Sequence, residues 1–207
     1  MRWPSPRSLI AAGVAIVLVA GLGVGAWLWA EARERRALSA YVEPLARLAA
    51  ARSTTLSPEA RAAVSRDLES ALAQYPSASI APDAAYELGN LRYAERDWAR
   101  ARSAWEVVST HAQSPTLRTL ARTGIGYAWE AEGNLAKAGE AFSRALGGLR
   151  PGDFYFEELL MAQARVQELS GEKAAAAETY RRLLRDVPQS LRADDVRSRL
   201  ASLGAAP

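Results

Sequence analysis

The sequence contains no cysteine and only one histidine, His111. The lack of cysteine excludes disulfides, a thiol nucleophile, a cysteine metal site and the lipidated cysteine of a lipoprotein. A single histidine leaves no second imidazole for a metal site or a catalytic dyad. No glycine-rich phosphate loop joins a strand to a helix, and the acidic pairs at 157–158 and 194–195 suit helix starts. We therefore expect no catalytic residues, no metal and no cofactor.

An excess of one charge is also missing from most of the chain. Residues 31–207 contain 24 basic and 23 acidic residues. Nucleic acid is bound by a concentrated basic surface, so we expect no nucleic-acid partner. The 177 residues of this part are enough for one domain with its own core.

Charge is absent altogether from the 23 residues between positions 8 and 30. A bilayer core about 30 Å thick needs roughly 20 apolar helical residues, and Trp27 and Trp29 would lie near its boundary. The alternative is a cleaved signal peptide, whose apolar stretch is about 7–15 residues long. Ala30-Glu31-Ala32 matches the small-x-small cleavage pattern only weakly. We predict a retained single-pass transmembrane anchor.

The flanking charges leave the orientation of this anchor open. The positive-inside rule compares basic residues on the two sides, and here the two sides are equal once the terminal amine is counted. Arg2 and Arg7 precede the anchor, and Arg33, Arg35 and Arg36 follow it.

Gly21 and Gly25 form a small-xxx-small pair within the anchor. Such a ridge lets two membrane helices approach closely and would support a homodimer. The alternative is that glycine is simply common in membrane helices.

Four sets of residues recur at separations of 37 and 38 positions between residues 89 and 183. A small residue on each helix of a pair would let the two helices approach closely. The aromatic residue lies four positions after the second small residue, so it shares the same helix face and fills the space between the helices. The turns Arg96-Asp97, Gly133-Asn134 and Gly171-Glu172 keep the same register, and glycine suits the left-handed end of a helix. The sets are Gly89, Gly126 and Ala164; Ala101, Ala138 and Ala176; Trp105, Phe142 and Tyr180; Val108, Ala145 and Leu183.

Other residues predict where the helices begin and end. Ser57-Pro58 and Ser114-Pro115 are each typical of an N-cap followed by proline, and we predict Asp153 as the N-cap of a further helix. Prolines at 76 and 188 would follow helix ends. Residues 31–52 and 58–75 are helix-like and form a degenerate first pair, and residues 191–203 are predicted as an amphipathic capping helix.

This pattern resembles the tetratricopeptide repeat. The resemblance is carried by residues 85–93 with 97–101, by Ile125-Gly126-Tyr127 with Phe142, and by residues 171–184. The family period is 34 residues, and the surplus here falls in the loops between repeats. The predicted fold is all-α, with a single transmembrane helix followed by an α-solenoid of three to four helix pairs and a capping helix. The predicted divisions are residues 1–7, a tail; 8–30, the anchor; 31–76, the degenerate pair or linker; and 77–207, the solenoid.

The resemblance implies that the first helix of each pair lines a concave groove. Tyrosines there offer large, rigid contact areas for a protein partner. The alternative for Tyr86 and Tyr93 is packing between repeats, because aromatic stripes at helical spacing are often core. A carboxylate clamp is not expected, since only Asn90 fits that scheme. The implied lining residues are Asp83, Tyr86, Asn90, Tyr93, Leu120, Thr123, Tyr127, Glu130, Glu158, Met161, Arg165 and Glu168.

The order of a short tail, one anchor and several repeats, the last ending in residues 183–190, resembles a group of bacterial inner-membrane proteins. Members of that group place their repeats in the periplasm and associate with the Sec translocon and periplasmic chaperones. The resemblance implies a non-enzymatic periplasmic scaffold for translocon subunits, chaperones or emerging client proteins. Two alternatives remain: a coordinator of envelope assembly or cell division, and a regulatory sensor that controls a partner enzyme.

Overall fold

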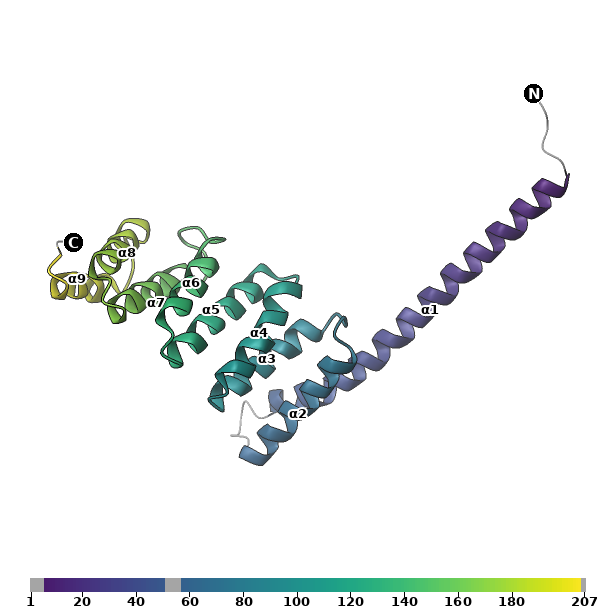
Figure 1. Ribbon diagram of the computed structural model, residues 1–207, viewed down its shortest axis with the longest axis horizontal. Helices are drawn as coiled ribbons and strands as arrows, with labels where there is room; N and C mark the ends of the chain where they lie inside the picture. Colours follow the sequence, from purple (N-terminus) through teal and green to yellow (C-terminus); the bar gives the residue numbers. More distant parts are fainter. Residues whose placement is uncertain (1–5, 51–56, 206–207) are drawn as a thin grey trace, which may run out of the picture.

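The chain forms a row of stacked helices with one long helix projecting from its end (Figure 1). The computed structural model describes residues 6–50 and 57–205, with side chains from residue 18 onward. These residues form nine α-helices and no strand, which confirms the prediction of an all-helical, tetratricopeptide-like solenoid. The helices are α1 (Pro6–Ala50), α2 (Pro58–Gln74), α3 (Ala81–Ala94), α4 (Trp98–His111), α5 (Pro115–Ala131), α6 (Leu135–Leu146), α7 (Phe156–Leu169), α8 (Lys173–Asp186) and α9 (Ala193–Ser202).

The helices pack in consecutive pairs, α3 with α4, α5 with α6, and α7 with α8, and α9 packs on α8. The recurring small and aromatic residues meet inside these pairs. An added Cβ at Gly89 would lie closer than 3.0 Å to the ring of Trp105, and one at Gly126 would lie equally close to Phe142. Both rings are buried. Glycine at these positions is what allows an aromatic ring to lie directly against the neighbouring helix backbone.

The same packing continues backward into α1 and α2, where the repeat is hard to recognise. Val64, Leu68 and Ala71 of α2 are buried and precede Ala101, Trp105 and Val108 by 37 positions each. Opposite them, Tyr41 of α1 is fully buried, and its hydroxyl donates toward the carbonyl oxygens of Ala71 at 3.1 Å and Tyr75 at 2.9 Å. The end of α1 therefore serves as the first helix of the solenoid.

The turns inside the pairs share one geometry. Arg96, Gly133 and Gly171 have φ values of 61°, 79° and 77°. The following amide donates to the carbonyl oxygen five residues earlier each time, as from Asn134 to Trp129 at 2.9 Å. This is the Schellman arrangement that ends a helix with a left-handed residue, and it confirms the predicted turns.

The predicted caps are correct in two cases and wrong in one. The Ser57 hydroxyl accepts from the Ala60 amide at 3.2 Å, and the Ser114 hydroxyl accepts from the Leu117 amide at 3.3 Å. Asp153 does not cap α7, because its carboxylate accepts from the Arg150 amide at 2.7 Å and closes a turn before the helix. Tyr155, with a left-handed φ of 72°, directly precedes α7 instead.

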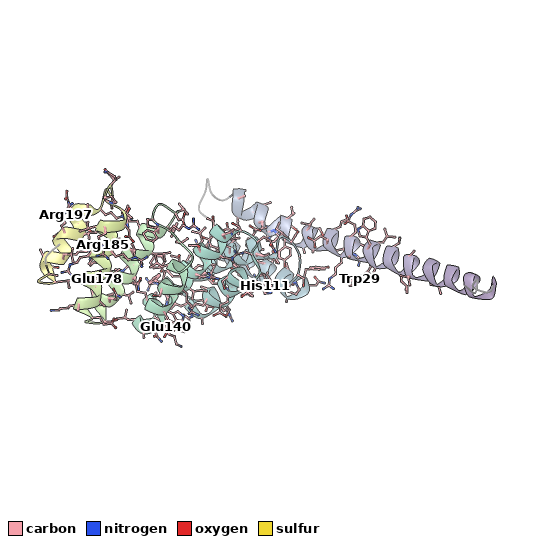
Figure 2. All side chains as sticks on the ribbon, turned by 90° about the horizontal axis from the view of Figure 1, so that it is seen from above. Trp29, His111, Glu140, Glu178, Arg185 and Arg197 are labelled. Atoms are coloured by element: carbon pink, nitrogen blue, oxygen red, sulfur yellow. The ribbon has the colours of Figure 1, made fainter. Side chains whose placement is uncertain are left out.

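Helix α1 runs unbroken from Pro6 to Ala50, across the predicted division at residue 30. Its residues 18–30 are exposed, and Figure 2 shows Trp29 on the part that projects away from the solenoid. The first buried residue is Ala37, and the Glu34 carboxylate accepts from the Ser79 amide at 3.0 Å. These contacts fix the direction in which α1 leaves the solenoid.

Within the residues whose side chains are described, 18–50 and 57–205, no helix combines the length and apolar composition needed to cross a membrane. Residues 8–17 of the predicted anchor are not among them. The transmembrane anchor therefore stays a prediction.

Candidate functional site

The predicted groove residues lie on three neighbouring first helices, α3, α5 and α7, and we call their shared surface the first-helix face. Asp83 is exposed, and Thr123 is the one member whose side chain is not accessible. Thr123 is only 2% exposed, and its hydroxyl donates to the Thr119 carbonyl oxygen at 2.8 Å. The partly exposed members are Tyr86, Asn90, Tyr93, Leu120, Tyr127, Glu130, Glu158, Met161, Arg165 and Glu168.

Two tyrosines of this face both pack and remain partly exposed. The ring centroid of Tyr93 lies 4.7 Å from that of Trp98 and 5.7 Å from that of Trp105. The ring of Tyr127 meets Phe142 edge-on at 5.2 Å. Each ring thus covers the aromatic core of its own repeat while one edge stays at the surface. Packing and groove lining are therefore not exclusive at these positions.

Ion pairs and hydrogen bonds join α5 to α7 across the first-helix face. Arg165 donates to both carboxylate oxygens of Glu130, at 2.8 and 2.7 Å. Tyr127 donates to Glu158 at 2.8 Å, and Arg192 donates to the other oxygen of that carboxylate at 2.8 Å. The two repeats are held in one register by these pairs.

This environment shifts the acidities of the groups that it joins. Burial raises the pKa of Glu158, but hydrogen bonds from Tyr127 and Arg192 outweigh burial and hold that pKa below its usual value. Burial, followed by the hydrogen bond to Glu158, raises the pKa of Tyr127 well above its usual range. Burial also raises the pKa of Tyr93, with a smaller contribution from Glu130. At neutral pH the carboxylate is therefore charged and both phenols are neutral.

Two hollows flank the first-helix face, one at each end. The hollow at the α1 end has a volume of about 310 Å³, and Leu45 and Leu48 of α1 face Asp83 and Tyr86 across it. The hollow at the α9 end has a volume of about 570 Å³, and it includes Glu158 and Arg192. A segment bound along the face would end in these two hollows.

Sequence reasoning missed the contributions of α1 and α9 to this site. Leu45 and Leu48 lie within the degenerate stretch of residues 31–52, which carries no repeat signature. Arg192 precedes a helix that was predicted only as a cap, and Ser190 beside it donates to Glu157 at 2.7 Å. Arg192 follows Glu158 by 34 positions, which does not match the 37- and 38-residue period of this chain, so the repeat pattern gave no signal for the pair.

The opposite side of the solenoid carries a larger hollow of about 600 Å³, between α4, α5 and α6. Its wall includes Trp129, whose ring already has cations against it. The Arg102 guanidinium carbon lies 3.5 Å and the Lys137 ammonium nitrogen 4.3 Å from the ring centroid. The single histidine, His111, is exposed in the last turn of α4, with Nδ1 3.1 Å from the Val107 carbonyl oxygen.

Comparisons with known proteins support the repeat architecture. Residues 158–190 match the sequence model of the tetratricopeptide repeat family, and this match covers α7 and α8. A solved structure described as "Functional Characterization of Pseudomonas Aeruginosa pilF" is similar over 97% of this chain and 91% of its own, with 18% identity and a TM-score of 0.54. At that identity the likeness shows the fold alone. No curated protein matches the sequence.

Proposed function

We propose that this chain is a non-enzymatic, membrane-anchored scaffold whose first-helix face binds a segment of another protein. Tetratricopeptide-like solenoids commonly present such a surface to protein partners. The observation that carries the proposal is the set of partly exposed aromatic and charged side chains already fixed by the Tyr127–Glu158 and Arg165–Glu130 contacts. Side chains that are already fixed lose less conformational entropy when a partner binds to them.

The proposed anchor is supported by the exposed apolar part of α1. Leu22 is 75% exposed and Trp27 and Trp29 are 65% and 64% exposed, without cover from the solenoid. Removing apolar surface from water gains about 25 cal/mol for each Å² buried, so a bilayer would stabilise this segment strongly. Gly21 and Gly25 have open space around them, which leaves room for a second copy of the helix in the proposed homodimer.

The proposed location is the bacterial inner membrane, with the repeats in the periplasm. The proposed partners are translocon subunits, periplasmic chaperones or emerging client polypeptides. These finer assignments are supported by the resemblance in the order of tail, anchor and repeats. Crosslinking would therefore have to be done in the intact membrane, where such partners are present.

The test places a photo-crosslinking amino acid at Tyr86 in the full-length, membrane-embedded protein. Tyr86 is partly exposed beside the 310 Å³ hollow and packs at the edge of the core cluster that contains Trp105. Glu140 of α6, which lines the 600 Å³ hollow on the opposite side and is labelled in Figure 2, is the matched control. We expect a discrete protein adduct from position 86 and not from position 140. Equal capture at both positions would show that the first-helix face is not the binding surface.

Point variants then test the same face without a crosslinker. Tyr86→Ala and Asn90→Ala should weaken recovery of the crosslinked partner, and Glu140→Ala should not. Tyr93 and Tyr127 are unsuitable for this test because both also pack against core rings. Translocon or chaperone adducts would support the proposed partners, whereas cell-division proteins would favour the coordinator of envelope assembly.

A further inference from the structure

The loops between repeats all lie on one edge of the solenoid, the edge nearest the apolar part of α1. The α2–α3 loop belongs there because the Ser79 amide donates to Glu34 of α1. Consecutive helices run in alternating directions, so every second connection returns to the same edge (Figure 1). The last loop is held there by the pairs that Arg192 and Ser190 form with the first turn of α7. We call this the anchor-side edge; its loops are residues 75–80, 112–114, 147–155 and 187–192.

The anchor-side edge carries two large apolar side chains in open solvent. Phe154 is 67% exposed and Leu191 is fully exposed at 103%. Both line the 570 Å³ hollow, so they form one patch from two loops. Among the described residues from 57 to 205, only Leu169 is another large exposed apolar residue, at 61%. Leu169 ends α7 and so lies at the opposite edge.

The backbone and charges around the patch suit a membrane surface. Tyr155 holds a left-handed φ of 72°, a conformation that is unfavourable for an aromatic residue, and its ring stacks edge-on with Phe154 at 4.7 Å. Arg150 in the same loop is exposed, as is the acidic Asp153, and the Arg192 side chain, which pairs with Glu158, is 47% exposed. Exposed aromatic and aliphatic side chains beside arginines are typical of segments that enter the headgroup region.

We propose that the anchor-side edge rests on the same bilayer that holds α1, with Phe154 and Leu191 inserted at the headgroup level. This inference depends on the proposed anchoring. Only six residues, 31–36, separate the uncharged run from the first buried residue, Ala37, and six helical residues span about 9 Å. The edge therefore begins close to the bilayer boundary. The solenoid would touch the membrane at a second place, and its partner would approach along the membrane surface.

The absence of cysteine makes a direct test possible. Single-cysteine variants Phe154→Cys, Leu191→Cys, Leu169→Cys and Leu22→Cys of the full chain are labelled with an environment-sensitive fluorophore. Each is reconstituted in phosphatidylcholine–phosphatidylglycerol vesicles with and without a nitroxide on the lipid. We expect the nitroxide lipid to reduce emission at positions 154, 191 and 22, and to leave position 169 unchanged. Position 169 carries the same label, so it controls for insertion by the label itself.

The outcomes separate this inference from the anchoring on which it depends. Quenching at 22 without quenching at 154 and 191 beyond the level at 169 would overturn the membrane contact and leave the anchor intact. No quenching at 22 would refute the anchor and the contact together. A blue shift at 154 without quenching would indicate a protein neighbour and overturn the proposal. As a second variant, Phe154→Glu should abolish quenching at Leu191→Cys, and unchanged quenching would count against insertion.

Discussion

Replacing Gly89 by alanine tests how the repeats pack at their closest point. A Cβ at this position would lie closer than 3.0 Å to the indole of Trp105, which is only 4% exposed. The ring has little room to shift, because the α5 backbone at Gly124 is also close to it: a Cβ built there would lie 2.9 Å from the indole. The indole is therefore enclosed between the backbones of α3 and α5.

Two opposing effects decide the magnitude. Alanine is more favourable than glycine inside a helix by about 1 kcal/mol. Overpacking a well-filled core costs about 1–3 kcal/mol, and the enclosed indole places Gly89→Ala near the upper end. We therefore expect a net loss of about 2 kcal/mol, a factor of roughly 30 in the ratio of folded to unfolded protein.

Gly139→Ala in α6 is the matched control. Its added Cβ would meet only the Val166 methyl carbon, at 3.8 Å, which is ordinary contact. Here the helix-propensity gain of about 1 kcal/mol should remain. The assay is urea unfolding of the full chain in detergent micelles, followed by helical circular dichroism. If Gly89→Ala unfolds at the same or a higher urea concentration than Gly139→Ala, the packing argument is wrong.

Four further variants test two hydrogen-bonded groups and the conformation of a turn. Tyr41→Phe removes a buried hydroxyl that satisfies two carbonyl oxygens and should cost about 1 kcal/mol in thermal or urea unfolding. Burial raises the pKa of Tyr41 to about 12, so the stability that its neutral hydroxyl contributes is complete below pH 10 and is lost as pH rises through 12. In Tyr41→Phe the free energy of unfolding should therefore fall less steeply with pH in this alkaline range. The lowered pKa of Glu158 predicts stability that is complete above about pH 4.5 and lost as pH falls through the lowered value, and Glu158→Gln should reduce that acid dependence in the same unfolding assay. Arg96→Gly should raise the melting temperature, because its left-handed φ of 61° costs a non-glycine residue about 1 kcal/mol or more, whereas Gly133→Arg at the equivalent turn should lower it.

The solenoid could be predicted because its signals are local. The sizes of Gly126 and Phe142 alone indicate that two helices pack closely, and Gly133 indicates the turn between them. The first pair was predicted only as a degenerate pair or linker, because Leu68 and Ala71 keep the register but are too common in helices to indicate a full repeat. Tyr41 became interpretable only once its hydroxyl was seen against the carbonyl oxygens of α2. The prediction of Asp153 as an N-cap was wrong because its carboxylate accepts a hydrogen bond from the Arg150 amide in the preceding turn.

The sequence allowed the positions of the candidate site residues to be predicted, but not the contacts that their side chains make. Helical spacing placed Asn90, Tyr127 and Arg165 at equivalent positions of successive first helices. The spacing could not show that the Thr123 side chain is buried, because its hydroxyl can donate a hydrogen bond to a carbonyl oxygen of its own helix. Nor could it show that Arg192 completes the Glu158 contacts, because that depends on how α9 packs against the end of the row.

Helix α1 links the proposed anchor to the proposed binding face through rigid contacts. Its exposed half carries Leu22 and Trp29, and its packed half buries Tyr41 against α2. Because one unbroken helix contains both halves, the rotation of the apolar half determines which solenoid edge faces the bilayer. The Glu34–Ser79 hydrogen bond restrains the solenoid from bending away at this junction. Relative to the proposed bilayer, a flexible linker would let the first-helix face take many orientations, whereas this helix would hold it at one height and one orientation. Recognition by such a scaffold would therefore depend on where a partner lies relative to the membrane as well as on the partner's sequence.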